Sequence, residues 1–596
     1  MEHRIAALDK DNCFSKKCHT ECITFCPVNK DGSECIILGS DNKAVISEPL
    51  CTGCGICVNK CPFEAITIVN MAHELGFDKI HQYDINSFRL YRLPTPIPGK
   101  IIGLVGKNGV GKTTALNILS GNLKPNLGNY ENSSSWNDIF DHFHGNELKK
   151  YFQKLSENKL NVSIKPQAVY KLKDYWRKSG LELLEKVSDL DNIETLINDL
   201  NLDKCVTKPV SELSGGELQR LSIAVASAKD ADVYFFDEPS SYNDVFQRLS
   251  VSKVIQKLAE KGKSVILVEH DITFLDYLSD YIHIIYGEAG AYGVVSSSLP
   301  SRTGINVLID GYLPNENIQF RDSKIKFNLY SPEELENQTS IILKYNSFSK
   351  TFDNFKLNVY EGEIKSGQIL GVIGGNSLGK TTFMKILAGF EKSDTNNINS
   401  PVKISYKPQY LNSDFNDNVK TLLHNLNSIK MEDQTFNSEI LRPLSIHKIL
   451  EKNIKKLSGG ELQKVAIVMC LMNDADIYAL DEPSAFIDVE DRIVLAKSIQ
   501  KFVKSNNKSA IIIDHDIQLI DILCDSLLLF TGINGVEGIA NSPSGKLKSM
   551  NKFLQNLQMT YRRDPQSNRP RVNKIGSRLD KEQKNSGMYY YLSQNE

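Results

Sequence analysis

The sequence predicts an α/β protein with two copies of one nucleotide-binding domain behind a small cysteine-rich domain. Three observations lead to this class. A phosphate-binding loop pattern occurs twice, the motifs after each loop recur in the same order, and nine of the twelve cysteines lie in the first 61 residues. At 596 residues the chain is too long for one compact core, and length alone favours about four domain-sized units.

The composition is that of an ordinary globular protein, with 41% hydrophobic and 24% charged residues. A net charge of −2 excludes a polycation that coats nucleic acid. No apolar stretch is long enough for a membrane helix, and the start MEHRIAALDKDNC lacks the apolar core of a signal peptide. We therefore expect no membrane span and a reducing compartment, where clustered cysteines hold metal rather than form disulfides.

The N-terminal cysteines form two groups. In the second group, CTGCGICVNKCP, the cysteines are separated by two, two and three residues, and a proline follows the last. That run holds a cubane cluster in bacterial-type ferredoxins, where the fourth cysteine binds the other cluster. Gly53 and Gly55 let the chain wrap the cluster closely. The first group, CFSKKCHTECITFCP, has looser spacing but also ends in Cys-Pro.

Cross-ligation between the groups predicts two [4Fe–4S] clusters. One set of ligands is Cys51, Cys54, Cys57 and Cys26, and the other is Cys13, Cys18, Cys22 and Cys61. Cys35 stays unassigned. The alternative is a pair of zinc sites, but zinc usually takes paired Cys-x-x-Cys knuckles, and the Cys-Pro endings fit that poorly. We expect Cys205, Cys470 and Cys524 to be ordinary core or surface residues.

Two phosphate-binding loops follow. GKNGVGKTT comes after the apolar strand IIGLV, and GGNSLGKTT comes after ILGVI. In such loops backbone N–H groups and a helix N-terminus surround phosphates, lysine contacts the β- and γ-phosphates, and threonine binds Mg²⁺. The predicted nucleotide-binding residues are Gly106, Asn108, Gly109, Gly111, Lys112, Thr113 and Thr114, and in the second loop Gly374, Asn376, Gly379, Lys380, Thr381 and Thr382.

The motifs around the loops repeat as well. LSGGEL occurs at Leu213–Leu218 and at Leu457–Leu462, and the apolar strands VYFFDEP and IYALDEP each end in Asp-Glu. The signature serine precedes the strand-end aspartate by 23 residues in both halves. The sequences VEHD and IDHD follow in the same order. Two copies of one α/β domain are therefore predicted.

In this motif order both halves resemble the ATP-binding-cassette (ABC) superfamily, whose fold is a P-loop ATPase domain. The resemblance implies that Asp237 and Asp481 join Thr113 and Thr381 in holding Mg²⁺. It implies that Glu238 and Glu482 orient and deprotonate the attacking water. It also implies that Gln167, Gln409, His270 and His515 sense the metal and the γ-phosphate. Ser214 and Gly216 would cap the nucleotide bound at Lys380, and Ser458 and Gly460 would cap the nucleotide bound at Lys112. Each ATP site would then be composite, with residues from both halves of the chain.

Aromatic residues upstream of each loop are candidates for stacking on adenine. They are Tyr83 and Phe88 in the first half, and Tyr345 with Phe352 or Phe355 in the second. The alternative for each is an ordinary core or strand aromatic, and the resemblance favours Tyr83 most.

Two positions depart from the cassette pattern. Ser377 stands where such loops usually have glycine, and a positive φ there would cost about 1–2 kcal/mol. We expect binding to survive with altered affinity. Asn243 occupies a normally apolar place, but Asp244 is retained. Because both catalytic glutamates are present, neither departure indicates a dead site.

The halves differ by an insertion at residues 136–164, where apolar residues at i, i+3, i+4 and i+7 predict a helix–loop–helix. A partner-contacting arm is favoured over a plain surface insertion. Residues 301–322 belong to neither cassette. The tail, residues 541–596, has 11 Lys and Arg against 4 Asp and Glu, which suits either RNA contact or an intramolecular charged hinge.

The combination of N-terminal clusters, tandem cassettes, an insertion in the first cassette and no membrane span resembles the E subfamily of ABC proteins, also called the RNase L inhibitor family. The resemblance includes LPTPIPGKIIGLVG, GINVLIDGYLPNENIQFRD and MNKFLQNLQMTYRRDPQSNRPRVNK. The predicted fold is an α+β ferredoxin-like domain followed by tandem ABC domains and hinges. We place the boundaries at residues 1–70, 71–300, 301–325, 326–545 and 546–596.

The resemblance implies an ATPase that splits ribosomes into subunits after termination or stalling, beside a release factor or Pelota-type partner. The protein would stay on the small subunit, contacting rRNA, ribosomal proteins and initiation factors. It would act as a cytoplasmic, and also nuclear, monomer with paired cassettes, and its clusters would be structural. Two rival functions stay open: the energy-coupling subunit of a membrane transporter, and a redox-coupled iron–sulfur ATPase.

Overall fold

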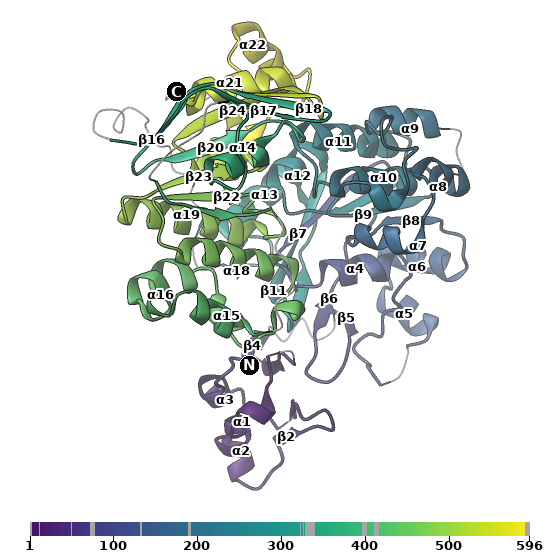
Figure 1. Ribbon diagram of the computed structural model, residues 1–596. Helices are drawn as coiled ribbons and strands as arrows, with labels where there is room; N and C mark the ends of the chain where they lie inside the picture. Colours follow the sequence, from purple (N-terminus) through teal and green to yellow (C-terminus); the bar gives the residue numbers. More distant parts are fainter. Residues whose placement is uncertain are drawn as a thin grey trace. The chain divides into compact units, whose positions relative to one another are not determined.

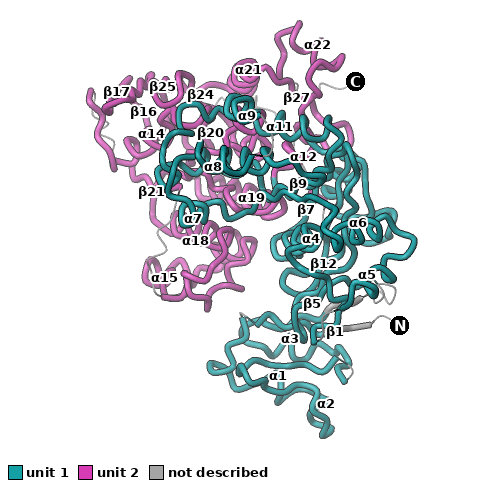
Figure 2. Tube along the Cα trace, turned by 90° about the vertical axis from the view of Figure 1, so that its right-hand side faces the viewer, with its two compact units in different colours: residues 1–242, 250–270, 278–323 teal, residues 243–249, 271–277, 324–596 magenta. Residues whose placement is uncertain are grey.

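The computed structural model describes residues 3–10, 12–48, 50–71, 78–131, 134–188, 192–321, 324–325, 327, 340–395, 402–409 and 417–590. The chain divides into two compact units (Figure 2). The first comprises residues 1–242, 250–270 and 278–323, and the second residues 243–249, 271–277 and 324–596. Two short segments of the first cassette, 243–249 and 271–277, are therefore part of the second unit.

The cysteine-rich domain is an α+β fold at the start of the first unit (Figure 1). Its strands pair antiparallel as β1 (His3–Leu8) with β4 (Ile66–Met71) and β2 (Ile36–Leu38) with β3 (Ala44–Ile46). Its short helices are α1 (Glu21–Thr24), α2 (Pro27–Lys30) and α3 (Ile56–Lys60). The apolar core is small and contains several of the cysteines. Asn86 of the first cassette exchanges side-chain hydrogen bonds of 2.8 and 2.9 Å with the backbone of Ile46.

The first cassette is built on a nine-stranded sheet within the described residues. The strand order is β5-β6-β12-β11-β7-β10-β9-β8, with β13 beside β11. The strands are β5 (Lys79–Gln82), β6 (Arg89–Tyr91), β7 (Ile101–Gly106), β8 (Val162–Lys165), β9 (Val233–Asp237), β10 (Ser264–Val268), β11 (Tyr281–Glu288), β12 (Tyr292–Val295) and β13 (Leu299–Pro300). Strands β7, β8, β9, β10 and β11 run parallel. The central strands β7, β9 and β10 are largely apolar, as expected for parallel strands that helices cover on both faces.

The helices of the first unit beyond the cysteine-rich domain follow the cassette order. They are α4 (Lys112–Leu119), α5 (Trp136–His142), α6 (Glu147–Ser156), α7 (Leu172–Tyr175), α8 (Gly180–Val187), α9 (Ile193–Asp199), α10 (Gly215–Ser227), α11 (Val245–Glu260), α12 (Ile272–Leu278) and α13 (Ser301–Asp310). Helices α11 and α12 cross into the second unit at residues 245–249 and 272–277.

The inserted helix–loop–helix is α5 and α6, as the periodicity predicted. A capping box between Ser135 and Asp138 begins α5, and the side chain of Asn146 caps α6. The inward-facing positions, among them Ile139 and Phe152, are buried in the core of the first cassette. The insertion is shorter than predicted, because α6 ends at Ser156 and residues 162–165 are already strand β8 of the cassette.

The second cassette repeats the sheet of the first strand for strand, which confirms the tandem α/β fold. Its order is β17-β18-β25-β24-β20-β23-β22-β21, with β26 beside β24 and a separate β16–β19 pair. The strands are β16 (Ile341–Tyr345), β17 (Phe348–Phe352), β18 (Phe355–Val359), β19 (Gly362–Lys365), β20 (Ile369–Ile373), β21 (Ile404–Lys407), β22 (Ile477–Asp481), β23 (Ser509–Ile513), β24 (Ser526–Ile533), β25 (Glu537–Ala540) and β26 (Ser544–Gly545).

The helices of the second unit occupy the corresponding places and continue into the tail. They are α14 (Lys380–Leu387), α15 (Val419–Leu426), α16 (Ser428–Glu432), α17 (Gln434–Phe436), α18 (Gly459–Met472), α19 (Val489–Ser505), α20 (Ile517–Leu523), α21 (Lys546–Leu557) and α22 (Arg578–Ser586). The tail hairpin of β27 (Tyr561–Arg563) and β28 (Pro570–Val572) lies between α21 and α22.

The segment predicted as the first hinge contains α13 and the hairpin of β14 (Tyr312–Leu313) and β15 (Ile318–Gln319). Residues 322–323 of that segment and residues 591–596 of the tail lie outside the described residues. Among the helices that the structure describes, none is long and apolar enough to cross a bilayer.

Candidate active sites and metal centre

The first phosphate-binding loop joins β7 to α4. Gly109 and Gly111 have φ angles of 79° and 93°, and a Cβ on Gly111 would come within 2.5 Å of the Phe88 ring. Position 111 therefore needs glycine, and the left-handed backbone at position 109 favours it. The Lys112 ammonium donates hydrogen bonds of 2.8 and 2.7 Å to the carbonyls of Gly106 and Lys107, which holds it inside the loop.

The predicted catalytic residues of the first cassette converge at the carboxyl ends of β9 and β10. Thr113 Oγ1 donates to Asp237 Oδ2 at 3.3 Å. Gln167 Nε2 donates to Glu238 Oε1 at 2.6 Å, and His270 Nε2 lies 3.5 Å from the same oxygen. Burial and the neighbouring Glu238 carboxylate raise the pKa of Asp237 to about 6. Lys165, Lys112 and Thr113 lower the pKa of Asp237 only in part, so a divalent cation beside Thr113 and Asp237 fits the residues present.

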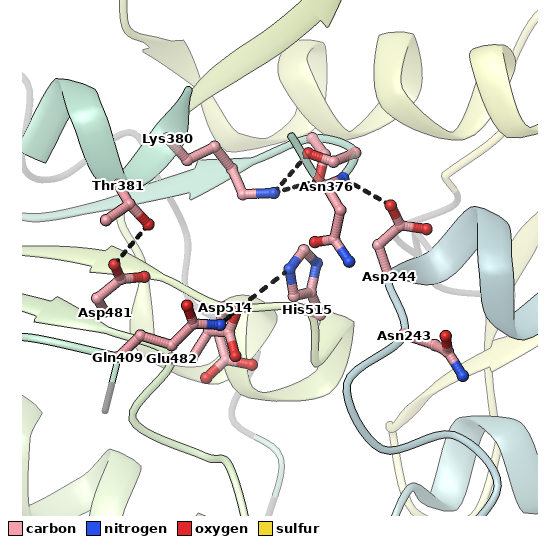
Figure 3. A network of polar contacts seen from close by, with 12 residues as sticks. Asn243, Asp244, Asn376, Lys380, Thr381, Gln409, Asp481, Glu482, Asp514 and His515 are labelled. Atoms are coloured by element: carbon pink, nitrogen blue, oxygen red, sulfur yellow. Dashed lines mark hydrogen bonds and ion pairs between the residues drawn. The ribbon is translucent and has the colours of Figure 1, made fainter. Parts of the chain in front are cut away.

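The second cassette reproduces the arrangement (Figure 3). Lys380 donates to the carbonyls of Gly374 and Gly375 at 2.8 and 2.7 Å, and Thr381 donates to Asp481 at 2.7 Å. Gln409 Nε2 donates to Glu482 Oε1 at 2.8 Å, and His515 Nε2 lies 3.5 Å from that oxygen.

Electrostatics keep the second glutamate ionised. Burial by itself raises the pKa of Glu482, but the adjacent His515 and Gln409 side chains outweigh burial and lower the pKa to about 2. The carboxylate is therefore charged at neutral pH, as a group that accepts a proton must be.

Two pairs of residues that the motifs did not reveal contact the backbone of the predicted catalytic glutamates. Lys165 donates to the backbone carbonyls of Asp237 and Glu238 at 2.6 and 3.2 Å, and Lys407 does so in the second cassette. Gln219 and Gln463 donate to the carbonyls of Glu238 and Glu482 at 2.6 and 2.5 Å. The signal was present, because Lys165 and Lys407 are the first letter of the repeated KPQ.

Both lysines are buried, and burial lowers the pKa of each to about 8. They still carry their charge below that pH, close to the strand-end carboxylates. A fixed positive group behind the acidic pair offsets part of the cost of burying it.

The signature serines begin helices in this structure. Ser214 and Ser458 are the N-cap residues of α10 and α18, each in a capping box with the glutamate three residues later. Both serines are exposed. Gly216 and Gly460 lie in the first turn of the same helices, where unpaired backbone N–H groups favour an anion.

The candidate adenine-stacking residues differ in their exposure and in their contacts. Tyr83 is 50% exposed, and its hydroxyl lies 3.1 Å from Thr114 Oγ1 at the start of α4. Phe88 packs against Gly111, and Phe355 packs in the same way against Gly379. Phe352 stacks on Phe355.

Tyr345 was predicted wrongly. It is 2% exposed and packs against Phe348 and Phe383 in the core of the second cassette. Neither face of its ring is accessible to an adenine, so the aromatic pair next to the second loop is Phe352 and Phe355.

The turn after Glu238 contacts the second loop directly (Figure 3). The backbone N–H of Asn376 donates to Asp244 Oδ2 at 2.6 Å, and the Asn376 amide donates to Gln247 at 3.3 Å. The unusual Asn243 is buried, and its carbonyl accepts a hydrogen bond of 2.9 Å from Arg248. The departure at Asn243 therefore leaves the contact made by Asp244 intact.

Ser377 adopts the left-handed conformation, with a φ of 58°, and Gly109 has a φ of 79° at the equivalent position of the first loop. We expect Ser377→Gly to raise the free energy of unfolding of the second cassette by about 1 kcal/mol, because relief of about 1–2 kcal/mol of strain exceeds the added chain entropy of glycine. The denaturation midpoint measures this change. The reciprocal variant Gly109→Ser should lower the midpoint, and shifts of both variants in one direction would contradict the explanation.

The first set of predicted cluster ligands surrounds one cavity. Cys13, Cys18, Cys22 and Cys61 line it together with apolar residues. Burial raises the pKa of the Cys22 thiol to about 12, and the other three sulfurs add to the effect because they are close. A positively charged iron–sulfur core in the cavity would offset the free-energy cost of ionising four thiols so close together.

The second set lies around Cys35. Burial and the neighbouring sulfurs of Cys51 and Cys54 raise the pKa of Cys57 to about 11. The Cys35 thiol is buried and interacts with Cys26 and Cys51, and burial raises its pKa to about 12. The sequence left Cys35 unassigned, and the structure places it beside the predicted ligands Cys26 and Cys51.

All twelve cysteines lie in described ranges and are free thiols. Four of them line one cavity, and thiolates around a cavity are the arrangement that holds a cubane cluster.

Comparison with known proteins agrees with this description. The ABC transporter family profile matches residues 96–241 and 357–485, and a 4Fe-4S binding domain matches residues 44–67. A possible Fer4-like domain in RNase L inhibitor matches residues 3–34. ABC transporter E family member 1 of Arabidopsis thaliana is 45% identical over 99% of both chains. The chain belongs to the E family of ABC proteins, the RNase L inhibitor family.

Other members of the family show the same extent of similarity. Translation initiation factor RLI1 of Saccharomyces cerevisiae is 44% identical over 99% of this chain and 98% of its own length. A structure of ribosome-bound archaeal Pelota and ABCE1 contains a chain that is 44% identical, with a TM-score of 0.95 over 99% of this chain and 100% of that one. Archaeal ABCE1 in complex with ribosomal stalk protein aP1 is 43% identical, with a TM-score of 0.82 over 87% and 100%.

These findings confirm the family, the tandem ABC fold behind a ferredoxin-like domain, and the ATPase activity. They also show that the N-terminal domain is of an iron–sulfur type.

Proposed function

We propose that this protein is an ATP-hydrolysing ribosome-recycling factor, which splits ribosomes into subunits after termination or stalling and stays on the small subunit. The observation that carries the proposal is the match along 99% of the chain to an archaeal ABCE1 bound with Pelota on the ribosome. A catalytic glutamate, glutamine and histidine are in contact in both cassettes, so each cassette has its own hydrolytic residues.

In each site the chain supplies the groups that hydrolysis needs. Glu238 and Glu482 accept the proton of the attacking water, and the Gln167 and Gln409 amides fix the carboxylates by hydrogen bonds. His270 and His515 contact the γ-phosphate. Lys112 and Lys380 exchange their carbonyl hydrogen bonds for phosphate oxygens. Thr113 with Asp237, and Thr381 with Asp481, would hold Mg²⁺, which would supply positive charge against the charge that develops on the leaving ADP. Ser214, Gly216, Ser458 and Gly460 contact nucleotide through their helix N-termini.

We assign two [4Fe–4S] clusters to the N-terminal domain. Cys13, Cys18, Cys22 and Cys61 would hold one, and Cys26, Cys51, Cys54 and Cys57 the other. Both are structural, because the small core of this domain cannot stabilise it without cross-links. Cys35 packs against the second set as a neighbour of the ligands.

The proposed partners are the small subunit, a release factor or Pelota-type factor, and initiation factors. The exposed face of α6 carries Lys150 and Lys154 and suits contact with rRNA phosphates. The site of action is the cytoplasm, and the nucleus where subunits are assembled.

Fractionation of a cell extract tests the proposal. With a non-hydrolysable ATP analogue, the protein should sediment with small ribosomal subunits, and the amount should fall when the analogue is omitted. Recovery with membrane vesicles, and none with ribosomal particles, would contradict the proposal and favour a transporter subunit.

A further inference from the structure

Two aspartates occupy equivalent positions in the two cassettes. Asp276 lies six residues after His270, in α12, and Asp521 lies six residues after His515, in α20. Both side chains are almost completely buried. Each helix begins two residues after its histidine, so a shift of the helix moves the histidine with it.

Arginines of the tail hairpin pair with both aspartates. Arg563 in β27 donates two hydrogen bonds to Asp521, of 2.7 and 2.9 Å, in a bidentate pair. Arg571 in β28 donates to Asp276 at 2.7 Å, and the fully buried Arg569 lies 3.0 Å from the same oxygen. All of these residues belong to the second unit.

Tyr561, the first residue of the hairpin, lies where the same two helices begin. It is completely buried, and burial together with the charges of Asp271 and Asp516 raises its pKa well above the ordinary value. Asp271 and Asp516 directly follow the two histidines, and their side chains accept hydrogen bonds from the first turns of α12 and α20. Arg248 and Arg492 pair with them in the same way in both cassettes.

In this conformation these guanidinium groups do not bind RNA. Arg563 and Arg569 are buried, and Arg571 is paired with Asp276. Of the two roles that the sequence left open for these arginines, the intramolecular one is therefore the one that the structure describes. Their partners are the helices that carry the histidines of the ATP sites.

We propose that the β27–β28 hairpin is a positioning element for ATP hydrolysis: Arg563 fixes α20 through Asp521, and Arg569 and Arg571 fix α12 through Asp276, so that the tail sets the positions of both histidines. The inference rests on the γ-phosphate contacts proposed above for His270 and His515. A buried ion pair holds two elements together, because separating the partners would leave an unpaired buried charge at a high cost in free energy.

The test compares Arg571→Gln with Arg571→Lys in the full chain. Arg571→Gln should lower kcat for ATP about tenfold and leave KM within about twofold, because a displaced catalytic group slows chemistry more than binding. Arg571→Lys keeps the charge that one hydrogen bond to Asp276 needs, so it should restore most of kcat. Arg563→Gln should behave like Arg571→Gln. Arg578→Gln is the matched control, because this tail arginine pairs with Glu582 on the exposed face of α22.

The outcomes separate the two proposals. A lower melting temperature with an unchanged kcat would show that the hairpin only stabilises the fold, and would overturn the inference. If Arg571→Gln does not fold, Asp276→Asn and Asp276→Glu are measured in the same way, with the same expected loss and rescue. If His270→Ala and His515→Ala leave kcat unchanged, the proposed roles of the histidines fail. If the histidine variants lower kcat but the arginine variants leave it unchanged, only the positioning role of the hairpin is contradicted.

Discussion

Replacing Glu238 and Glu482 together with glutamine should lower kcat for ATP by at least about a hundredfold, the range in which loss of a positioned general base falls. Each carboxylate accepts a hydrogen bond from a glutamine and lies next to a histidine, whereas the neighbouring Asp237 and Asp481 accept from Thr113 and Thr381. Glutamine keeps the size of the side chain and removes the proton acceptor. Phosphate release at saturating ATP measures the change, while ATP binding should persist.

Glu157→Gln is the control, because this carboxylate follows the exposed end of α6 and has no place in either site. The two single variants separate the contributions of the cassettes. If the double variant kept more than about a tenth of the wild-type rate, which is about 1.4 kcal/mol of barrier, another group would have to be the base.

Replacing one predicted ligand from each cysteine set should have the largest effect on stability. Cys22→Ser and Cys57→Ser are each expected to remove the iron of one cluster and to destabilise the N-terminal domain, because binding free energy of a metal centre is also folding free energy. Cys57 belongs to the small apolar core and Cys22 packs against it, so the loss also disrupts packing. Iron and acid-labile sulfide per chain, measured after anaerobic purification, report the outcome.

Cys35→Ser is the matched control, since Cys35 is buried, as Cys26 and Cys57 are, and interacts with the predicted ligands Cys26 and Cys51. It should keep the iron of both clusters. Loss of iron from Cys35→Ser, together with full retention in Cys26→Ser, would exchange the assignments of these two cysteines.

The residues of the two candidate sites could be found in the sequence because their signals are local. A phosphate-binding loop, a strand that ends in Asp-Glu and a following histidine are short patterns, and their repetition in the same order made each one more specific. The parallel sheet then brings the carboxyl ends of β7, β9 and β10 to one edge, as parallel strands must.

The features that sequence reasoning missed depend on distant contacts. Tyr345 has the position of a stacking aromatic, but its burial is set by Phe383, 38 residues further along the chain. The tail arginines looked equally suited to RNA, and their acidic partners are far away, with Arg571 and Asp276 separated by 295 residues. Charge counts contain no information about such pairs.

The inserted helix–loop–helix also has one feature that the sequence predicts and one that it does not. The apolar periodicity predicted α5 and α6 and their buried faces, because a helix packs through one stripe. The end of the insertion was placed too late, since residues 162–165 form a strand whose pairing with β9 is not visible locally.

Sucrose-gradient sedimentation of purified ribosomes with this protein, a release factor or Pelota-type factor, and ATP tests the central claim most directly. We expect the wild-type chain to convert ribosomes into separate subunits, with the protein recovered on the small subunit. The variant that carries both Glu238→Gln and Glu482→Gln should show no repeated rounds of splitting. Intact ribosomes that persist with the wild-type chain at the level seen with the double variant would contradict the account.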